Sequence, residues 1–210
     1  MNYTQLKTAI QDYTQSSETS FVTNIDTFIK QAENRLFFDI DVPDFHKNVT
    51  GTMTQNNTFL QKPEDLFKVY SLAVIKTGNV YSYMLPKDVS FIREAFPDAD
   101  DSGLPTHYGN FDDEFFIVGP VPDDDYSVEL HYKFQPDALS STNANRWFGD
   151  NAEAALLYAT LVEAYTYLKG EQDIMSFYGE RYSSALQALQ NYGAAEVNMD
   201  SYRNTMRRTA

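Results

Sequence analysis

The sequence predicts an α+β fold: an antiparallel helical bundle built from the N- and C-terminal helices, with an inserted antiparallel β-rich domain and an extended C-terminal tail. Helical spacing of apolar residues occurs at both ends of the chain, short β-prone runs fill the middle, and the last stretch has few large aliphatic side chains. We expect a helical domain over residues 1–43 and 137–193, a β-rich domain over 44–136, and an extension over 194–210.

Two helices are expected in the N-terminal part. Residues 3–13 place apolar side chains at steps of three and four, which predicts a short amphipathic helix. Ser16 and Ser17 come directly before a second such stripe, so we expect them to begin a longer helix that ends before Pro43. The apolar positions that predict these helices are Tyr3, Leu6, Ile10 and Tyr13, then Phe21, Ile25, Phe28, Ile29, Ala32 and Leu36.

Between Phe45 and Pro136 the pattern changes to short runs rich in β-branched and aromatic residues. Gly78 and Asn79 separate two of these runs and suit positive backbone φ, so they predict a tight hairpin. Residues 87–96 step their apolar side chains at helical spacing and predict a short helix within this region. The expected strands cover residues 46–54, 57–61, 66–75, 79–85, 106–111, 114–119 and 126–134.

The helical pattern returns after a polar linker at residues 137–149. Asp150, with Glu153 three places on, resembles the start of a capped helix that ends at Gly170. The short break there predicts an antiparallel pair with a further helix, for which Gly193 is the expected C-terminal cap. The apolar positions are Ala154, Leu157, Leu161, Ala164, Tyr165 and Leu168 in the first helix, and Ile174, Phe177, Tyr178, Ala185, Leu186 and Leu189 in the second.

Composition excludes several classes of protein. The chain of 210 residues has no cysteine, which rules out disulfides, thiolate zinc sites and cysteine nucleophiles, and is compatible with a reducing cytoplasm. No apolar run is long enough to span a membrane, and the N-terminal residues do not resemble an export signal. The net charge of −14 argues against direct grip on nucleic acid, because phosphate binding requires clustered lysine and arginine.

No familiar catalytic or phosphate-binding motif is present, so we expect neither an enzyme nor a cofactor. The histidines His46, His107 and His131 lie in or beside expected strands without ligand spacing, so we expect a structural role for each. Paired carboxylates for glycoside cleavage are not excluded by the sequence, but no pattern supports them.

One acidic segment resembles part of a calcium loop. Asp98, Asp100 and Ser102 match the first three ligand positions, and Gly103 matches the turn glycine. The match then fails, because Gly109 stands where the loop needs a bidentate glutamate. We therefore expect a solvated acidic turn and no metal site.

Two further acidic segments, 112–114 and 123–125, are also expected to form solvated turns, the first within a hairpin. Their alternative role is an electrostatic contact with a basic partner.

The charge of the C-terminal extension opposes that of the rest of the chain. Arg203, Arg207 and Arg208 fall within the last eight residues of an otherwise acidic protein. A basic arm on an acidic body suits docking onto a neighbouring copy or ring. A frayed, solubilising terminus is the alternative explanation.

The order and the local sequence of several segments resemble those of the head-to-tail adaptor, or connector, proteins of short-tailed bacteriophages. The resemblance spans nearly the whole chain and involves no catalytic signature. The segments that carry it are NYTQLKTAIQDYTQ, TSFVTNIDTFIKQAENRLF, KNVTGTMT, SLAVIKTGNVYSYMLPKDVSFIREAFP, GLPTHYGNFDDEFFIVGPVPDDDYSVELHY, ALLYATLVEAYTYLKGEQDI and FYGERYSSALQAL.

This resemblance implies a structural virion protein without enzymatic activity or cofactor, made in the host bacterial cytoplasm and located at the head-tail junction. About twelve copies would form a ring beneath the portal, extend the DNA channel and provide the tail attachment platform. The implied partners are the portal protein and tail hub or nozzle proteins, with tail fibre proteins as further candidates. Genomic DNA would pass without specific binding, and no membrane is involved. The implied candidates for portal contact are Tyr202, Arg203, Met206, Arg207 and Arg208.

Two other functions remain open at this point. The aromatic middle region and its acidic turns also suit a tail spike or fibre component that binds or cleaves host surface glycans. A free-standing cytoplasmic regulator with a peptide-binding β-domain is the third reading. Stoichiometry separates the tail component from the adaptor, because tail spikes and fibres are commonly trimers whereas an adaptor should be present in about twelve copies.

Overall fold

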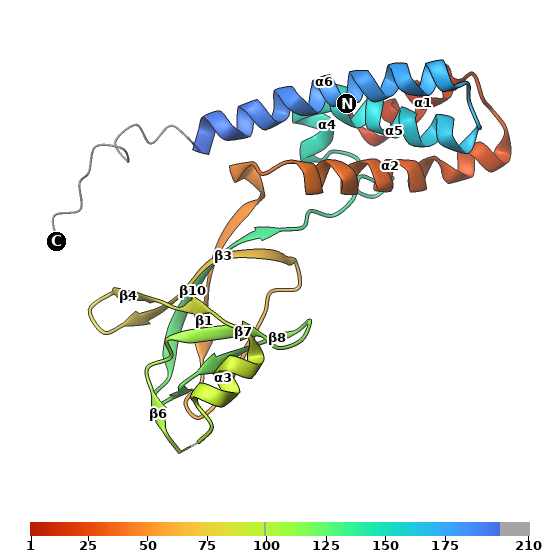
Figure 1. Cartoon of the computed structure of the whole chain (residues 1–210). Helices are drawn as coiled ribbons and strands as arrows, with labels where there is room; N and C mark the ends of the chain where they lie inside the picture. Colours follow the sequence, from red (N-terminus) through yellow and green to blue (C-terminus); the bar gives the residue numbers. More distant parts are fainter. Residues whose placement is uncertain (99, 198–210) are drawn as a thin grey trace. The chain divides into compact units, whose positions relative to one another are not determined.

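Residues 1–98 and 100–197 are described by a computed structural model (Figure 1). Its contacts divide the chain into two compact units. The helical unit comprises residues 1–44 and the chain from Asp137 onward, and the β unit comprises Phe45–Pro136. Helices dominate the first and antiparallel strand pairs the second, so the mixed α+β class predicted from the sequence is confirmed.

The helical unit contains two N-terminal and three C-terminal helices among its described residues. A capping box formed by Asn2 and Gln5 opens the first helix, which matches the predicted span. The second begins after Glu18 without a side-chain cap, so the prediction that Ser16 and Ser17 begin it is wrong. Gln15 ends the first helix in a left-handed conformation, with φ of 49°, and the two serines lie in the connection that follows. The helices are α1 (Tyr3–Thr14), α2 (Thr19–Asp39), α4 (Trp147–Asn151), α5 (Glu153–Tyr167) and α6 (Gln172–Val197).

Helix α5 is the centre of the helical unit, because α1, α2, α4 and α6 all contact it. The sequence misplaced part of its buried face: Ala154 is exposed and Leu157 half-buried, whereas Ala155 and Leu156 are buried. Apolar residues surround most of this helix, so their spacing does not select one face. The core of the unit includes Leu6, Ile10, Phe21, Ile25, Ile29, Leu36, Leu156, Ala159, Leu161 and Ala164.

The predicted start of this C-terminal helical region is also wrong. Asp150 lies within the short helix α4, and α5 begins after Ala152, which provides no side-chain cap. The break at Ala152 has no breaker residue to mark it, since neither glycine nor proline occurs there.

Gly193 does not cap the last helix, because α6 continues to Val197. A Cβ atom at Gly193 would lie 2.7 Å from the carbonyl oxygen of Asp41 and 3.0 Å from Cγ1 of Val42. The glycine therefore permits close packing of α6 on the chain that follows α2. Residues 194–197 consequently belong to α6 and not to the predicted extension.

The β unit contains two four-stranded sheets and one two-stranded pair among its described residues. The first sheet has the order β1-β10-β3-β4 and is antiparallel throughout. The second has the order β2-β8-β7-β5, and its β5–β7 pair is parallel. The β6–β9 pair is also parallel. The strands are β1 (His46–Met53), β2 (Phe59–Gln61), β3 (Leu66–Lys76), β4 (Val80–Tyr83), β5 (Leu85–Pro86), β6 (Ser102–Gly103), β7 (His107–Asn110), β8 (Phe115–Gly119), β9 (Val121–Pro122) and β10 (Tyr126–Phe134), with a 3-10 turn at Pro43–Phe45 and helix α3 at Val89–Ala95.

Several local predictions for the β unit are confirmed. Gly78 and Asn79 form the turn between β3 and β4 with positive φ values of 83° and 62°. Helix α3 lies within the predicted span of 87–96. The predicted strand at 79–85, however, is two strands, because the chain leaves the first sheet at Met84 and joins the second as β5. The sequence also missed β6 and β9, which are too short to show a period.

The core of the β unit contains buried side chains from both sheets. Tyr132 belongs to it, and its hydroxyl donates a hydrogen bond of 2.7 Å to Oδ1 of Asp65. Burial, followed by this contact, raises the pKa of Tyr132 to about 12. The cluster consists of Met53, Leu60, Leu72, Val74, Met84, Tyr108, Phe116, Val118, Val128, Leu130 and Tyr132.

Candidate interaction surfaces

An aromatic cluster occupies one end of the α5–α6 pair in the helical unit. The rings of Tyr165 and Tyr178 stack with centroids 5.2 Å apart, and the Tyr165 hydroxyl donates a 2.8 Å hydrogen bond to the carbonyl oxygen of Tyr13. Burial and the neighbouring tyrosines raise the pKa of Tyr178. Phe177, at the edge of the cluster, is about half-exposed. The cluster thus leaves the Phe177 ring and parts of the tyrosine rings in contact with solvent.

A groove of about 480 Å³ lies at the other end of the same helix pair. Alanine side chains contribute much of its lining, and Tyr192, another lining residue, is half-exposed. Tyr178, Ala185 and Tyr192 are spaced by seven residues, which places them on one side of α6. We call the surface formed by the aromatic cluster and this groove the α5–α6 seam. The residues that line the groove are Asp44, Trp147, Asn151, Ala152, Glu153, Ala154, Ala155, Ala185, Ala188, Leu189 and Tyr192.

A buried carboxylate joins α2 to the segment that precedes α4. Oε2 of Glu33 accepts a 2.8 Å hydrogen bond from the backbone N–H of Leu139, whereas Oε1 has no hydrogen-bond partner among the described residues. Burial raises the pKa of Glu33 to about 7, although the Leu139 N–H and the nearby Arg146 act in the opposite direction. Arg146 forms an ion pair of 2.9 Å with Asp137.

Polar contacts also connect α2 to α5 and α6. Arg35 of α2 forms an ion pair with Glu163 of α5. The Tyr182 hydroxyl of α6 donates a 2.9 Å hydrogen bond to Oδ2 of Asp39, and burial raises the pKa of this tyrosine. These directional contacts fix how the three helices pack.

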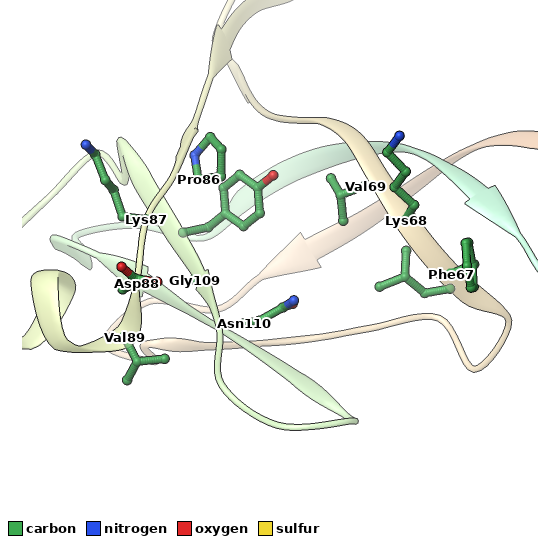
Figure 2. A pocket seen from close by; sticks show the side chains of 11 residues that line it. Phe67, Lys68, Val69, Pro86, Lys87, Asp88, Val89, Gly109 and Asn110 are labelled. Carbon is green, nitrogen blue, oxygen red and sulfur yellow. The ribbon is translucent and has the colours of Figure 1, made fainter. Parts of the chain in front are cut away.

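A cavity of about 660 Å³ opens within the β unit (Figure 2). One wall is the first part of β3, where Lys68 and Val69 line the space. The opposite wall contains Lys87, and Asn110 of β7 lies between the two walls. The cavity is lined by Leu66, Phe67, Lys68, Val69, Pro86, Lys87, Asp88, Val89, Tyr108, Gly109 and Asn110.

Comparison with known families assigns the chain to one of them. Residues 1–209 match the family described as SU10 adaptor protein. The chain belongs to the SU10 adaptor protein family. This confirms the resemblance to phage head-to-tail adaptor proteins. None of the curated proteins compared with the chain matches it.

Membership in the adaptor family implies a structural, non-enzymatic component of a phage virion that associates with other head-tail proteins. Within the described part of the chain, no helix is both long and apolar enough to cross a membrane. The predicted portal contacts of this adaptor cannot be placed on its surface, because they lie outside the described residues: Tyr202, Arg203, Met206, Arg207 and Arg208.

The histidines of the adaptor lie among aromatic rings. Nε2 of His46 is 2.9 Å from the Tyr70 hydroxyl, and the ring of His131 lies 5.6 Å from that of His46. His107 is 2.9 Å from the hydroxyl of Thr106 and packs near two phenylalanines of the α3 region. Among the described residues, no three His, Cys, Asp or Glu side chains gather in a way that could hold a metal ion.

In the acidic turns of the adaptor, carboxylates accept hydrogen bonds from nearby groups of the same chain. Oδ1 of Asp98 accepts a hydrogen bond of 2.9 Å from the N–H of Asp100. Oδ1 of Asp112 accepts two backbone hydrogen bonds in its own turn, and Asp123 accepts a 2.6 Å hydrogen bond from the Tyr126 hydroxyl. Local turn formation therefore accounts for acids in these positions.

Proposed function

We propose that about twelve copies of this adaptor form a ring beneath the portal, extend the DNA channel and provide the platform to which the tail attaches. In this proposal, residues 1–43 and 137–197 form the ring wall, the domain at 44–136 serves the tail, and the chain after α6, residues 198–210, reaches the portal. The portal contacts are assigned to Tyr202, Arg203, Met206, Arg207 and Arg208.

The observation that carries the ring is the exposed α5–α6 seam. Clustered exposed aromatic residues are typical of protein interfaces, and small side chains in the neighbouring groove allow close approach of another chain. A closed ring needs heterologous contacts, in which one face of a subunit meets a different face of the next. The seam supplies one such face on the unit that the proposal places in the wall.

The charge of the chain supports passage of DNA without specific binding. A net charge of −14 makes an acidic lining the natural outcome for a ring of identical copies. Phosphates would then meet repulsion instead of the lysine and arginine contacts that hold DNA on a protein.

Native mass spectrometry of the chain, alone and mixed with the portal protein of the same genome, tests the proposal. We expect a discrete complex with about twelve copies on the portal. Deletion of residues 198–210, which leaves α6 intact, should abolish this complex while leaving thermal melting unchanged. The triple change Arg203→Glu, Arg207→Glu and Arg208→Glu is the matched test at full length. Retained binding in both variants contradicts the assignment of the portal contacts.

The seam is tested separately by Phe177→Glu. Phe177 is about half-exposed, so the change should affect folding little but should prevent neighbouring copies from closing a ring. Tyr83→Glu is the control, because Tyr83 is an exposed aromatic residue on β4 in the other unit. Equal ring formation by the two variants would exclude the seam from the ring interface.

The alternative of a tail spike or fibre component that binds host glycans predicts a different mass. A trimer that ignores the portal would support that alternative. The family match favours the adaptor, since it covers nearly the whole chain.

A further inference from the structure

The cavity of Figure 2 arises where β4 separates from β3. The β3–β4 ladder runs only from Ala73 to Lys76 on β3, and Met84 then donates a 2.8 Å hydrogen bond to the carbonyl of Leu72. Beyond that point the chain crosses to the second sheet, where β5 pairs with β7. The edge of β3 that pairs with β4 at Ala73–Lys76 is therefore not covered by β4 in the first part of the strand, where it borders the cavity.

This wall has the form of a strand edge. The β3 residues that line the cavity run from Leu66 to Val69, and at the rise of a β-strand they offer an edge of about 13 Å. Their other side pairs with β10 in a ladder that has two register shifts, between residues 131 and 132 and between residues 133 and 134, so the wall is an extended strand with local bulges. An exposed strand edge presents main-chain N–H and C=O groups that another extended chain can pair with.

The opposite wall is packed rigidly. The backbone N–H of Lys87 donates a 2.8 Å hydrogen bond to the carbonyl of Tyr108, and a Cβ at Gly109 would lie 2.7 Å from the carbonyl oxygen of Lys87. Tyr108 is buried. The cavity is therefore bounded by a tightly packed strand–turn contact and does not depend on a loose loop on this side.

Positive charge lies on both walls. Lys68 and Lys87 line the cavity, and neither forms an ion pair among the described residues. Their ammonium groups instead lie near aromatic rings, 5.5 Å from the centroid of Tyr70 and 4.9 Å from that of Phe91. Asp88 is the single carboxylate of the lining. In a β unit whose acidic residues outnumber its basic ones, this lining is locally basic.

We propose that this cavity binds an extended, acidic peptide segment of another protein, which adds as a strand to the edge of β3 and places its carboxylates beside Lys68 and Lys87. Strand addition gives affinity through main-chain hydrogen bonds, and the flanking lysines select the charge of the segment. We assign the segment to a tail component, and this choice of source rests on the proposed adaptor function. The inference that the cavity binds an acidic strand does not depend on that function.

The probes are two labelled seven-residue synthetic peptides, one alternating valine with glutamate and the other valine with lysine, titrated into the full chain by fluorescence anisotropy. We expect the glutamate peptide to bind and to bind more weakly as salt is raised. The double change Lys68→Glu and Lys87→Glu should weaken it at least ten-fold and should favour the lysine peptide. Lys76→Glu is the matched control, because Lys76 is exposed on the same strand within the ladder that β4 already covers.

Hydrogen exchange distinguishes strand addition from a loose electrostatic contact. Successive N–H groups of a strand point to opposite sides, so bound glutamate peptide should slow exchange of the one amide of the pair Lys68 and Val69 that faces the open edge, and should leave the amides of β1 unchanged. The proposal is overturned if the glutamate peptide does not bind, if both peptides bind equally, or if Lys76→Glu weakens binding as much as the double change. Binding of an acidic oligosaccharide without amide protection, in place of the peptide, would instead identify a glycan site.

Portal binding by the same double variant separates this proposal from the ring. A variant that loses the peptide but still forms the portal complex confirms an independent site. If the wild-type chain does not bind the portal, the proposed ring is contradicted, and the peptide titration still tests the cavity independently.

Discussion

The two units of the molecule differ in how the sequence assembles them. The helical unit joins segments from both ends of the chain, so that α2 packs on α5 and Arg35 meets Glu163. The β unit is one continuous segment, Phe45–Pro136. A change in either terminal segment therefore acts on the helical unit, whereas the β unit has all its core residues within one stretch of chain.

The units also differ in what they bury. Both cores combine aliphatic side chains with aromatic rings, but the core of the helical unit also includes one carboxylate, Glu33, with an elevated pKa. In the β unit the hydroxyl of the buried Tyr132 reaches Asp65 near the surface. Stability of the helical unit should therefore respond to pH in a range where the β unit has no corresponding described carboxylate.

The largest expected effects come from one core substitution in each unit. Leu156→Ala should lower the free energy of unfolding of the helical unit by about 2–5 kcal/mol, and Phe116→Ala that of the β unit by about 3–5 kcal/mol, because both side chains are fully buried. Trp147 is the one tryptophan of the chain and lies in α4, so its fluorescence in urea reports the helical unit. Amide exchange of β10 reports the β unit.

Each variant serves as the control for the other. We expect Leu156→Ala to shift the Trp147 transition and Phe116→Ala to leave it within about 0.5 kcal/mol. A Trp147 transition that shifts equally in both variants would break the comparison, because the two units would then unfold as one.

A smaller effect is expected from Glu33→Gln, and its size depends on pH. The pKa of Glu33 is about 7 in the folded chain and about 4.3 when unfolded, so the folded state binds the proton more tightly. Its contribution to stability is greatest below the unfolded pKa and is lost as pH rises towards 7. The substitution should therefore raise the free energy of unfolding at pH 8 by up to about 3 kcal/mol, and change it little at pH 4.

The measurement is urea unfolding of the helical unit, followed by Trp147 fluorescence at both pH values. The matched control is Glu180→Gln, since Glu180 is an exposed glutamate on α6. Equal effects of Glu33→Gln at pH 4 and pH 8 would show that the carboxylate does not carry the pH dependence.

The smallest effects compare two glycines of α6. Gly193→Ala should destabilise by about 1–3 kcal/mol, because the new Cβ would lie 2.7 Å from the backbone oxygen of Asp41. Gly179→Ala should stabilise by about 0.5–1 kcal/mol, because no atom lies within 4 Å of that Cβ and alanine favours the helix. Thermal melting checks both signs, and stabilisation by both substitutions would contradict the close contact.

The sequence predicted α1, α2, α3, α5, α6 and most strands because their apolar spacing is local information, but it missed the short helix α4, part of which lies in the expected linker. Ser16, Asp150 and Gly193 each looked like helix ends, and the structure places the ends elsewhere. Local signals of this kind do not include contacts with distant parts of the chain. Gly193 shows the cause most clearly, since the carbonyl of Asp41 that requires a glycine there is far away in the sequence.

The candidate sites were less predictable than the fold. Met84 is buried, while Tyr83 and Leu85 beside it are exposed, so the alternation expected of one strand continues through the point where the chain changes sheets. Nothing in that local pattern indicates that β4 leaves β3, and the cavity between Lys68 and Lys87 follows from that departure. The portal contacts predicted for the C-terminal residues lie outside the described chain and stay a prediction.

Because the helical unit is built from two separated segments of the chain, its two parts are synthesised at different times. Helix α2 ends at Asp39 and its partner α5 begins at Glu153, so a ribosome must make the entire β unit in between. At roughly 5–20 residues per second, that interval is of the order of ten seconds. During it, the apolar face of α2 waits for the helix that will cover it, while the β unit already has its complete sequence. Nascent chains are therefore most open to chaperones, and to aggregation, at their first helices.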